Sequence, residues 1–205
     1  MPVRAAAQVL GLTERQVWRL LKAYRLRGAD GLISRKRGRP SNRKAAPALA
    51  FAGEHAIATL CIPTTADPTG ADERLAAALS GAGVDLVILS GYLRKLGPTT
   101  LAVFGGRILN IHPALLPRHG GQGMYGRRVH DAVIAAGETE TGATVHLVDD
   151  EYDHGAVVAQ VRLAVEPGDT AASVERKVMA AEPALFVETL QRLVSGTLTL
   201  PHLPV

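Results

Sequence analysis

The sequence has little of several features that define other classes of protein. Its 205 residues include a single cysteine, Cys61, so an internal disulfide is excluded and a reducing, cytoplasmic setting is expected. Because Cys61 lies in an apolar run, we expect a buried and unreactive thiol. No apolar run reaches about eighteen residues, and residues 1–4 do not begin a signal peptide. We therefore expect no membrane partner.

Aromatic residues are also scarce. They make up 4% of the chain, whereas 47% of the residues are hydrophobic and are mainly alanine, valine and leucine. This balance favours layers of helices and strands over an all-β sandwich, and 205 residues suffice for one such domain with a small appendage. The composition therefore predicts an α/β fold.

Acidic residues are nearly absent from the first part of the chain. Residues 1–45 contain twelve Lys/Arg and two Asp/Glu, a charge of +10, whereas residues 46–205 carry −6. A split of this size indicates two segments with different partners. We divide the chain into a basic segment at 1–33, a basic linker rich in turn formers at 34–47, and a domain at 48–205.

The basic segment contains two candidate helices, at residues 5–10 and 13–27, separated by a turn in which Thr13 can cap the second helix. It resembles the latter two helices of a transposase-type helix-turn-helix, and residues 37–40 resemble the core of an AT-hook. These resemblances imply weak DNA contacts, and the alternative is a solvated basic helix and linker. The residues that would contact DNA are Arg15, Gln16, Arg19, Arg37 and Arg39.

After the linker, short apolar strands alternate with amphipathic helices. This alternation predicts a doubly wound, mostly parallel sheet whose ligands bind at the carboxyl ends of the strands. The expected strands are 57–62, 84–89, 107–111, 144–148 and 156–165, and the expected helices are 72–79, 129–136 and 171–194.

Residues 107–117 (RILNIHPALLP) carry the most informative motif. Side chains repeat every two residues along a strand, so Asn110 and His112 share one face, and Pro113 ends the strand beside them. An amide donor and an ionisable donor at a strand end suit the stabilisation of a developing oxyanion. The alternative is a pair of turn-forming or surface residues.

A second polar segment follows at residues 149–155 (DDEYDHG), in a glycine-containing loop between two expected strands. A carboxylate in this loop could support a neighbouring histidine and relay protons. Acidic turns between strands are also common without any such role.

Three runs of the sequence closely resemble glycinamide ribonucleotide formyltransferases: LNIHPALLP, GATVHLVDDEYDHGAVVAQ and LVILSGYLRKLGP. The resemblance covers residues 48–198, with the motifs in the family's order. It implies a formyltransferase-type fold and direct transfer of a formyl group from 10-formyltetrahydrofolate to the amine of glycinamide ribonucleotide in purine biosynthesis. The resemblance implies neither a covalent enzyme intermediate nor a metal.

The resemblance also assigns roles to individual residues. Asn110 and His112 would polarise the formyl carbonyl, and Asp153 would support His112 and the proton transfers. Glu182 would meet the amine, whereas we expect a structural role for His146. The residues expected to hold the folate are Leu93, Arg94, Lys95 and Leu96 on one side, and Asp149 and Asp150 on the other.

Two other patterns carry less information. Residues 120–126 (GGQGMYG) could suggest a phosphate-binding loop, but they resemble the mobile loop that follows the family's catalytic strand. His119, His130 and His154 lack the spacing of zinc ligands, so we expect no metal site.

The chain departs from the family at its start. No segment of it resembles the strand and loop that cradle the ribonucleotide phosphate, so we expect a sheet truncated at its start, with an unpaired edge. The missing loop puts transfer to the ribonucleotide in question, unless another chain or a homo-oligomer supplies it. The alternatives are a DNA-binding protein and an inactive fusion of transposase and formyltransferase fragments.

Overall fold

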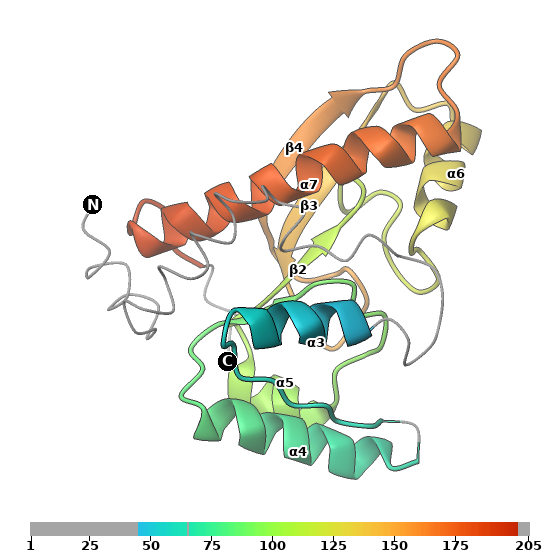
Figure 1. Cartoon of the computed structure of the whole chain (residues 1–205). Coiled ribbons are helices and arrows are strands. Elements are labelled where there is room, and N and C mark those ends of the chain that lie inside the picture. The colour runs from blue at the N-terminus through green and yellow to red at the C-terminus, as the bar shows by residue number, and fades with distance from the viewer. Residues whose placement is uncertain (1–44, 65, 201–205) are drawn as a thin grey trace.

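The computed structural model of the chain describes residues 45–64 and 66–200. Helices and strands alternate through most of this range, as the apolar patterning predicts (Figure 1). In chain order the elements are α3 (Ala45–Glu54), α4 (Pro68–Gly81), β1 (Val87–Leu89), α5 (Pro98–Phe104), β2 (Ile108–His112), α6 (Arg127–Ala135), β3 (Glu140–Leu147), β4 (Val157–Ala164) and α7 (Ala171–Val194).

The described strands form one sheet in the order β1-β2-β3-β4. The predicted α/β class is confirmed, and β1 and β2 are parallel. The prediction of parallel pairing is wrong for β3 and β4, since β2–β3 and β3–β4 are both antiparallel. The loop 148–156 between β3 and β4 contains no helix, and a parallel pair would need a longer crossover.

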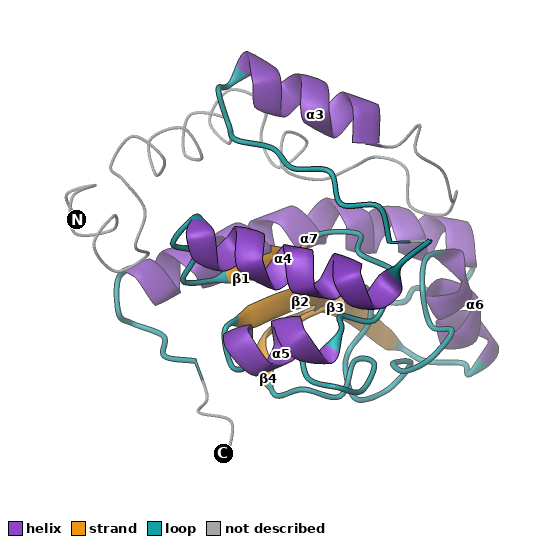
Figure 2. Cartoon of the chain, turned by 90° about the horizontal axis from the view of Figure 1, so that it is seen from below, coloured by secondary structure: helices purple, strands orange, loops and turns teal. Residues whose placement is uncertain are grey.

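Helices cover both faces of the sheet (Figure 2). On one face, α7 packs against β3 and β4, where Val174 and Val178 are fully buried among Leu109, Val145 and their neighbours. On the other face, α4 and α5 cover β1 and the start of β2 through a smaller cluster that includes Phe104 and Ile108. The molecule is therefore a layered α/β structure in this range.

The alternation of side chains along the strands separates core from polar positions. Leu109 and Ile111 of β2 pack towards α7, so Asn110 and His112 lie on the opposite face. In β3, residues 143, 145 and 147 pack towards α7, which leaves Thr144 and His146 on the same side as Asn110 and His112. The sheet thus gathers its polar side chains on one face.

Two glycines let backbone segments come close together around β3. A Cβ atom on Gly142 would overlap the carbonyl oxygen of Val161 in β4, and one on Gly155 would overlap the carbonyl oxygen of Leu147. Only residues without a side chain allow these approaches. They fix both ends of the β3–β4 pair that carries the loop 148–156.

Most predicted elements form close to their expected bounds, and the last helix begins at Ala171 and ends at Val194 as predicted. Thr170 caps this helix, because its hydroxyl accepts a hydrogen bond from the Ser173 backbone N–H while the Ser173 side chain accepts one from the Thr170 backbone N–H. The sequence reading missed α3 and α5.

The strand predicted at 57–62 does not form. Residues 57–64 form neither a helix nor a paired strand, and the side chains of Ile57 and Leu60 are 39% and 67% exposed. Cys61 is exposed as well, so the prediction of a buried thiol is wrong. An apolar run becomes a strand only beside a partner, and among the described residues this run has none.

The helices expected at 5–10 and 13–27 lie outside the described residues. Of the expected linker, the last three residues belong to α3, which begins at Ala45. None of the helices in the described ranges combines the length and the apolar character needed to cross a membrane.

Candidate active site

An ion pair between His112 and Asp153 occupies the end of β2. The His112 Nδ1 atom lies 3.3 Å from Asp153 Oδ2, and only 3% and 11% of the two side chains are exposed. On its other side, His112 Nε2 is 2.9 Å from the carbonyl oxygen of His119. Both ring nitrogens thus face oxygen acceptors, and only a doubly protonated imidazole can donate to both.

Asp153 reaches His112 from the loop 148–156. Its φ of 55° lies in the left-handed region, which aspartate tolerates better than most residues. The Gly121 backbone N–H donates to Asp153 Oδ2 at 3.0 Å, so this carboxylate is held by two donors. The loop therefore presents the carboxylate in a fixed direction.

Asn110 is oriented by His146, which lies directly opposite it in the β2–β3 register. Asn110 Nδ2 donates to His146 Nε2 at 3.1 Å, while His146 Nδ1 donates to the carbonyl oxygen of Leu147 at 2.7 Å. This pattern requires a neutral His146 with its proton on Nδ1. The second N–H of the Asn110 amide can then donate to a ligand.

The protonation of the cluster follows from burial and charge. Burial acts to raise the pKa of Asp153, but the hydrogen bond and charge of His112 and the Gly121 N–H outweigh it and hold that pKa below its usual value. Burial lowers the pKa of His146, aided by the charge of His112 and opposed by its bond to Leu147 and by Asp153. The site therefore favours an ionised Asp153 and an uncharged His146.

Thr144 fixes the segment that follows His112. Its fully buried hydroxyl donates to the carbonyl oxygen of Ala114 at 2.6 Å and accepts from the Leu116 N–H at 3.0 Å. The Gln160 side chain donates to Thr144 Oγ1 and to the carbonyl oxygen of Leu116, both at 2.9 Å. Because these buried groups are all paired, the chain leaves β2 along a defined path.

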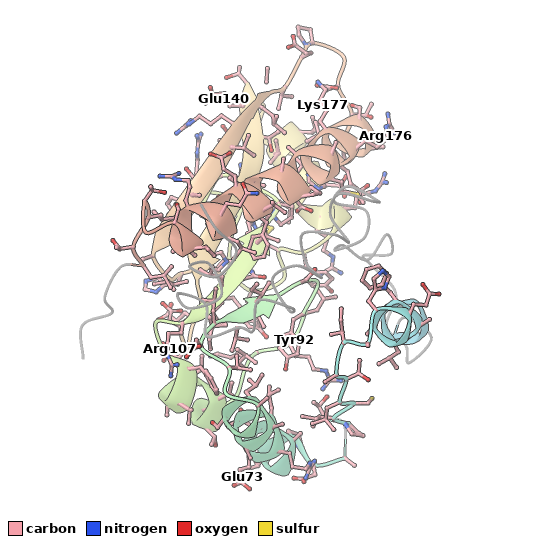
Figure 3. The ribbon with its side chains drawn as sticks, turned by 60° about the vertical axis from the view of Figure 1, so that its left-hand side comes forward. Glu73, Tyr92, Arg107, Glu140, Arg176 and Lys177 are labelled. Carbon is pink, nitrogen blue, oxygen red and sulfur yellow. The ribbon has the colours of Figure 1, made fainter. Side chains whose placement is uncertain are left out.

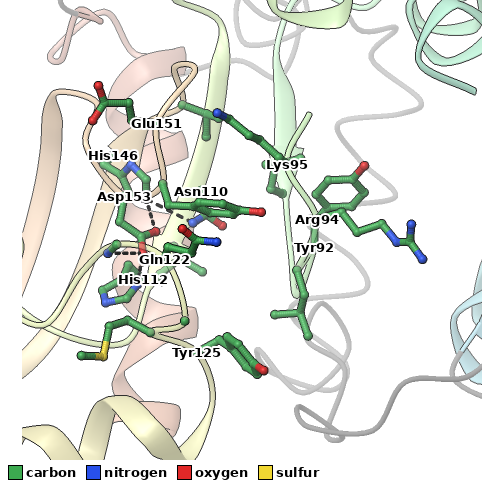
Figure 4. Close-up of a pocket in the computed structure, with 18 of the residues that line it drawn as sticks. Tyr92, Arg94, Lys95, Asn110, His112, Gln122, Tyr125, His146, Glu151 and Asp153 are labelled. Atoms are coloured by element: carbon green, nitrogen blue, oxygen red, sulfur yellow. Dashed lines mark hydrogen bonds and ion pairs between the residues drawn. The ribbon is translucent and has the colours of Figure 1, made fainter. Parts of the chain in front are cut away.

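A cavity of about 350 Å³ opens beside these residues, within the range of small-molecule sites. Asn110, His112 and Asp153 lie on one wall, and the loop after β1 forms the facing wall with Tyr92 and Arg94 (Figure 4). The cavity lining combines apolar groups with a few convergent polar atoms, which suits the binding of a ligand with a flat ring and polar edges. The remaining lining includes Leu89, Gln122, Met124, Tyr125, Arg128, His146, Val148, Glu151 and Tyr152.

The structure brings most of the predicted site residues together. Residues 93–96 and Asp149 line the cavity, although Asp149 also accepts from the Glu151 N–H and from His154, both at 2.9 Å. Asp150 and Glu182 do not line it, and Glu182 is 1% exposed within α7. The predicted DNA-contacting residues lie outside the described range.

Sequence reasoning missed two features of the site. One is the contact between His146, for which we expect a structural role, and Asn110, because no local pattern specifies the register that brings the two together. Tyr125 also lines the cavity, with the Arg128 guanidinium 5.1 Å from its ring centroid. Among the described residues, no three or more His, Cys, Asp or Glu side chains are placed so that they could hold a metal ion together.

The layered α/β fold places an Asn–His–Asp cluster at a strand end beside a cavity, an arrangement typical of enzyme active sites. The formyl transferase family profile matches residues 34–190, about three quarters of the chain. The chain therefore belongs to the formyl transferase family. A winged helix-turn-helix profile separately matches residues 1–48.

Individual relatives agree with this assignment. The chain is 44% identical over 108 residues to the chloroplastic phosphoribosylglycinamide formyltransferase of Arabidopsis thaliana, covering 53% of this chain and 37% of that protein. It is 36% identical over 129 residues to the Haemophilus influenzae enzyme, covering 63% and 58%. The crystal structure of the Bacillus halodurans enzyme superposes with a TM-score of 0.66 at 30% identity, over 78% of each chain. The chain thus spans between about a third and three fifths of the length of these two curated relatives.

Proposed function

We propose that this protein transfers a formyl group from 10-formyltetrahydrofolate to the amine of glycinamide ribonucleotide. The observation that carries the proposal is the buried His112–Asp153 pair beside Asn110, on the wall of a cavity that can accept a flat ring. The 36–44% identity to phosphoribosylglycinamide formyltransferases supports the choice of reaction.

The donor supplies an activated formyl group on nitrogen. In transfer, a bond forms between the acceptor amine and the formyl carbon, the bond from that carbon to the donor nitrogen breaks, and one proton passes from the amine to that nitrogen. The free N–H of Asn110 and a protonated His112 stabilise negative charge on the formyl oxygen. Asp153 orients His112 through the contact at its Nδ1 atom and supports the proton transfers that accompany attack by the amine.

The described residues fit the donor better than the acceptor. The wall formed by residues 92–96 combines apolar side chains, which suit a ring system, with two cations, Arg94 and Lys95, which suit a carboxylate tail on that ring system. Glu182, which the resemblance assigns to the amine, is buried in α7 away from the cavity lining. The test therefore measures donor binding and transfer separately.

The decisive experiment follows the absorbance change of the folate on loss of its formyl group, with a full-length relative as the positive control. We expect His112→Ala to lower kcat by about 10²–10³-fold, as expected for loss of an oxyanion donor. The matched control is His55→Ala, which removes a histidine that follows α3, contacts the carbonyl oxygen and ring of Phe51, and does not line the cavity. Wild-type protein that binds the donor but never transfers its formyl group would reject the proposal.

A second candidate function is DNA contact by the basic segment and the basic linker. The winged helix-turn-helix match to residues 1–48 and the charge of +10 on residues 1–45 favour it. On an AT-rich duplex, the full chain should retard mobility at micromolar concentration, with binding that weakens steeply as salt rises. The double variant Arg37→Ala/Arg39→Ala should bind more weakly, with Arg176→Ala of α7 as the matched control. If the wild-type protein leaves the mobility of the duplex unchanged, this function is rejected.

A further inference from the structure

The carbonyl group that holds His112 belongs to a residue with an unusual backbone conformation. His119 has a φ of 55°, in the left-handed region, and its carbonyl oxygen lies 2.9 Å from His112 Nε2. A non-glycine residue keeps this conformation only where its surroundings hold it. The direction of the His112 ring therefore depends on what holds residue 119.

Glu138 is the group that holds it. One carboxylate oxygen, Oε1, lies 3.1 Å from His119 Nε2, and the other, Oε2, lies 2.7 Å from Arg118 Nη1. The side chains of His119 and Glu138 are only 16% and 20% exposed, whereas that of Arg118 is 55% exposed. Because exposed ion pairs contribute little, the His119 contact is the stronger restraint.

Glu138 is itself anchored. Its backbone N–H donates to the carbonyl oxygen of Val133, a fully buried residue of α6, at 3.2 Å. The restraint thus runs from the helix through Glu138 and His119 to His112. The same segment also reaches Asp153, because the Gly121 N–H donates to that carboxylate at 3.0 Å.

We propose that Glu138 is a positioning residue, which fixes the ring of His112 through the side chain and carbonyl group of His119. It does not line the cavity, and it acts on the reacting atoms only through His112. Without Glu138 the His119 side chain loses the carboxylate that it contacts, and without His119 the carboxylate keeps only its contact with Arg118 among those described above. The inference rests on the proposed function only for its effect on catalysis.

The experiment reads His112 directly by NMR of protein labelled with ¹⁵N-histidine, with the His112 signals identified by their loss in His112→Ala. In Glu138→Ala and His119→Phe we expect the Nε2 signal of His112 to shift, because its acceptor is no longer fixed. Glu138→Gln should largely restore it, since the amide oxygen still accepts from His119. The control is Glu140→Ala, which removes an exposed ion pair with Arg162. Glu140 begins β3 and lies far from the cavity residue Tyr92 (Figure 3).

The kinetic expectation is a fall in kcat of about tenfold for Glu138→Ala and His119→Phe, with the KM for the donor changed less than about twofold. Unshifted His112 signals in both variants would overturn the positioning role, and if Glu138→Ala fails to fold, His119→Phe decides alone. A wild-type protein without transfer activity would refute the proposed function, while the NMR result would still settle the role of Glu138.

Discussion

The strands β2 and β3 and the segment 45–64 are both rich in apolar residues, yet their burial differs greatly. Leu109 and Val145 are fully buried between the sheet and α7, whereas Leu49 is 41% and Leu60 67% exposed. The apolar content of a segment therefore does not determine whether it enters the core. What separates the two regions is pairing: β2 and β3 have neighbours on both sides, and residues 57–64 have no strand partner among the described residues.

The largest expected contrast between the two regions is in amide hydrogen exchange. Amides in the β2–β3 pairing should exchange more slowly than their intrinsic rates by a factor on the order of 10³ or more, because they open only with much of the domain. Amides of residues 58–62 should exchange near their intrinsic rates. Mass spectrometry of peptides that cover the two regions measures both. Strong protection at 58–62 would show that this segment pairs with a partner in solution.

A second contrast uses one substitution in each region. Thr144→Val keeps the shape of the side chain but leaves the Ala114 carbonyl and the Leu116 N–H without their partner, so the free energy of unfolding should fall by about 2–4 kcal/mol. Thr59→Val, in the exposed segment, should change it by less than about 0.5 kcal/mol. Urea titration measures both, and equal effects would contradict the difference in order between the regions.

The smallest expected effect concerns the pH dependence of stability at His146. Burial lowers its pKa below 6.5 in the folded state, so below that pH the unfolded chain binds a proton that the folded protein does not. Stability should therefore fall from pH 7.5 to 5.5, and His146→Gln should reduce this fall by about 1 kcal/mol.

His154 provides a control of opposite sign for that measurement. Its hydrogen bond with Asp149 raises its pKa, so protonated His154 stabilises the fold at the lower pH. His154→Gln should therefore make the fall from pH 7.5 to 5.5 steeper. If both variants change the fall in the same direction, the assignment of a neutral, buried His146 is wrong.

The parts of the fold that depend on local pattern could be predicted from the sequence. The shared face of Asn110 and His112 follows from the two-residue repeat of a strand, and the bounds of α7 follow from its periodicity and the cap at Thr170. The direction and register of β3 depend on contacts distant in sequence, so the position of His146 opposite Asn110 could not be predicted. The failed strand at 57–62 has the same cause, because strand formation requires a partner that no local pattern specifies.

The two close backbone approaches at Gly142 and Gly155 have a consequence for how this family can vary. Any side chain at either position would collide with a carbonyl oxygen of a neighbouring segment, so selection should hold both residues constant. Between Leu147 and Gly155, by contrast, the side-chain bonds that shape the loop come from Asp149, Asp153 and His154. Related sequences can therefore diversify at residues 150–152, and with them the rim of the cavity, while the frame that carries Asp153 stays unchanged.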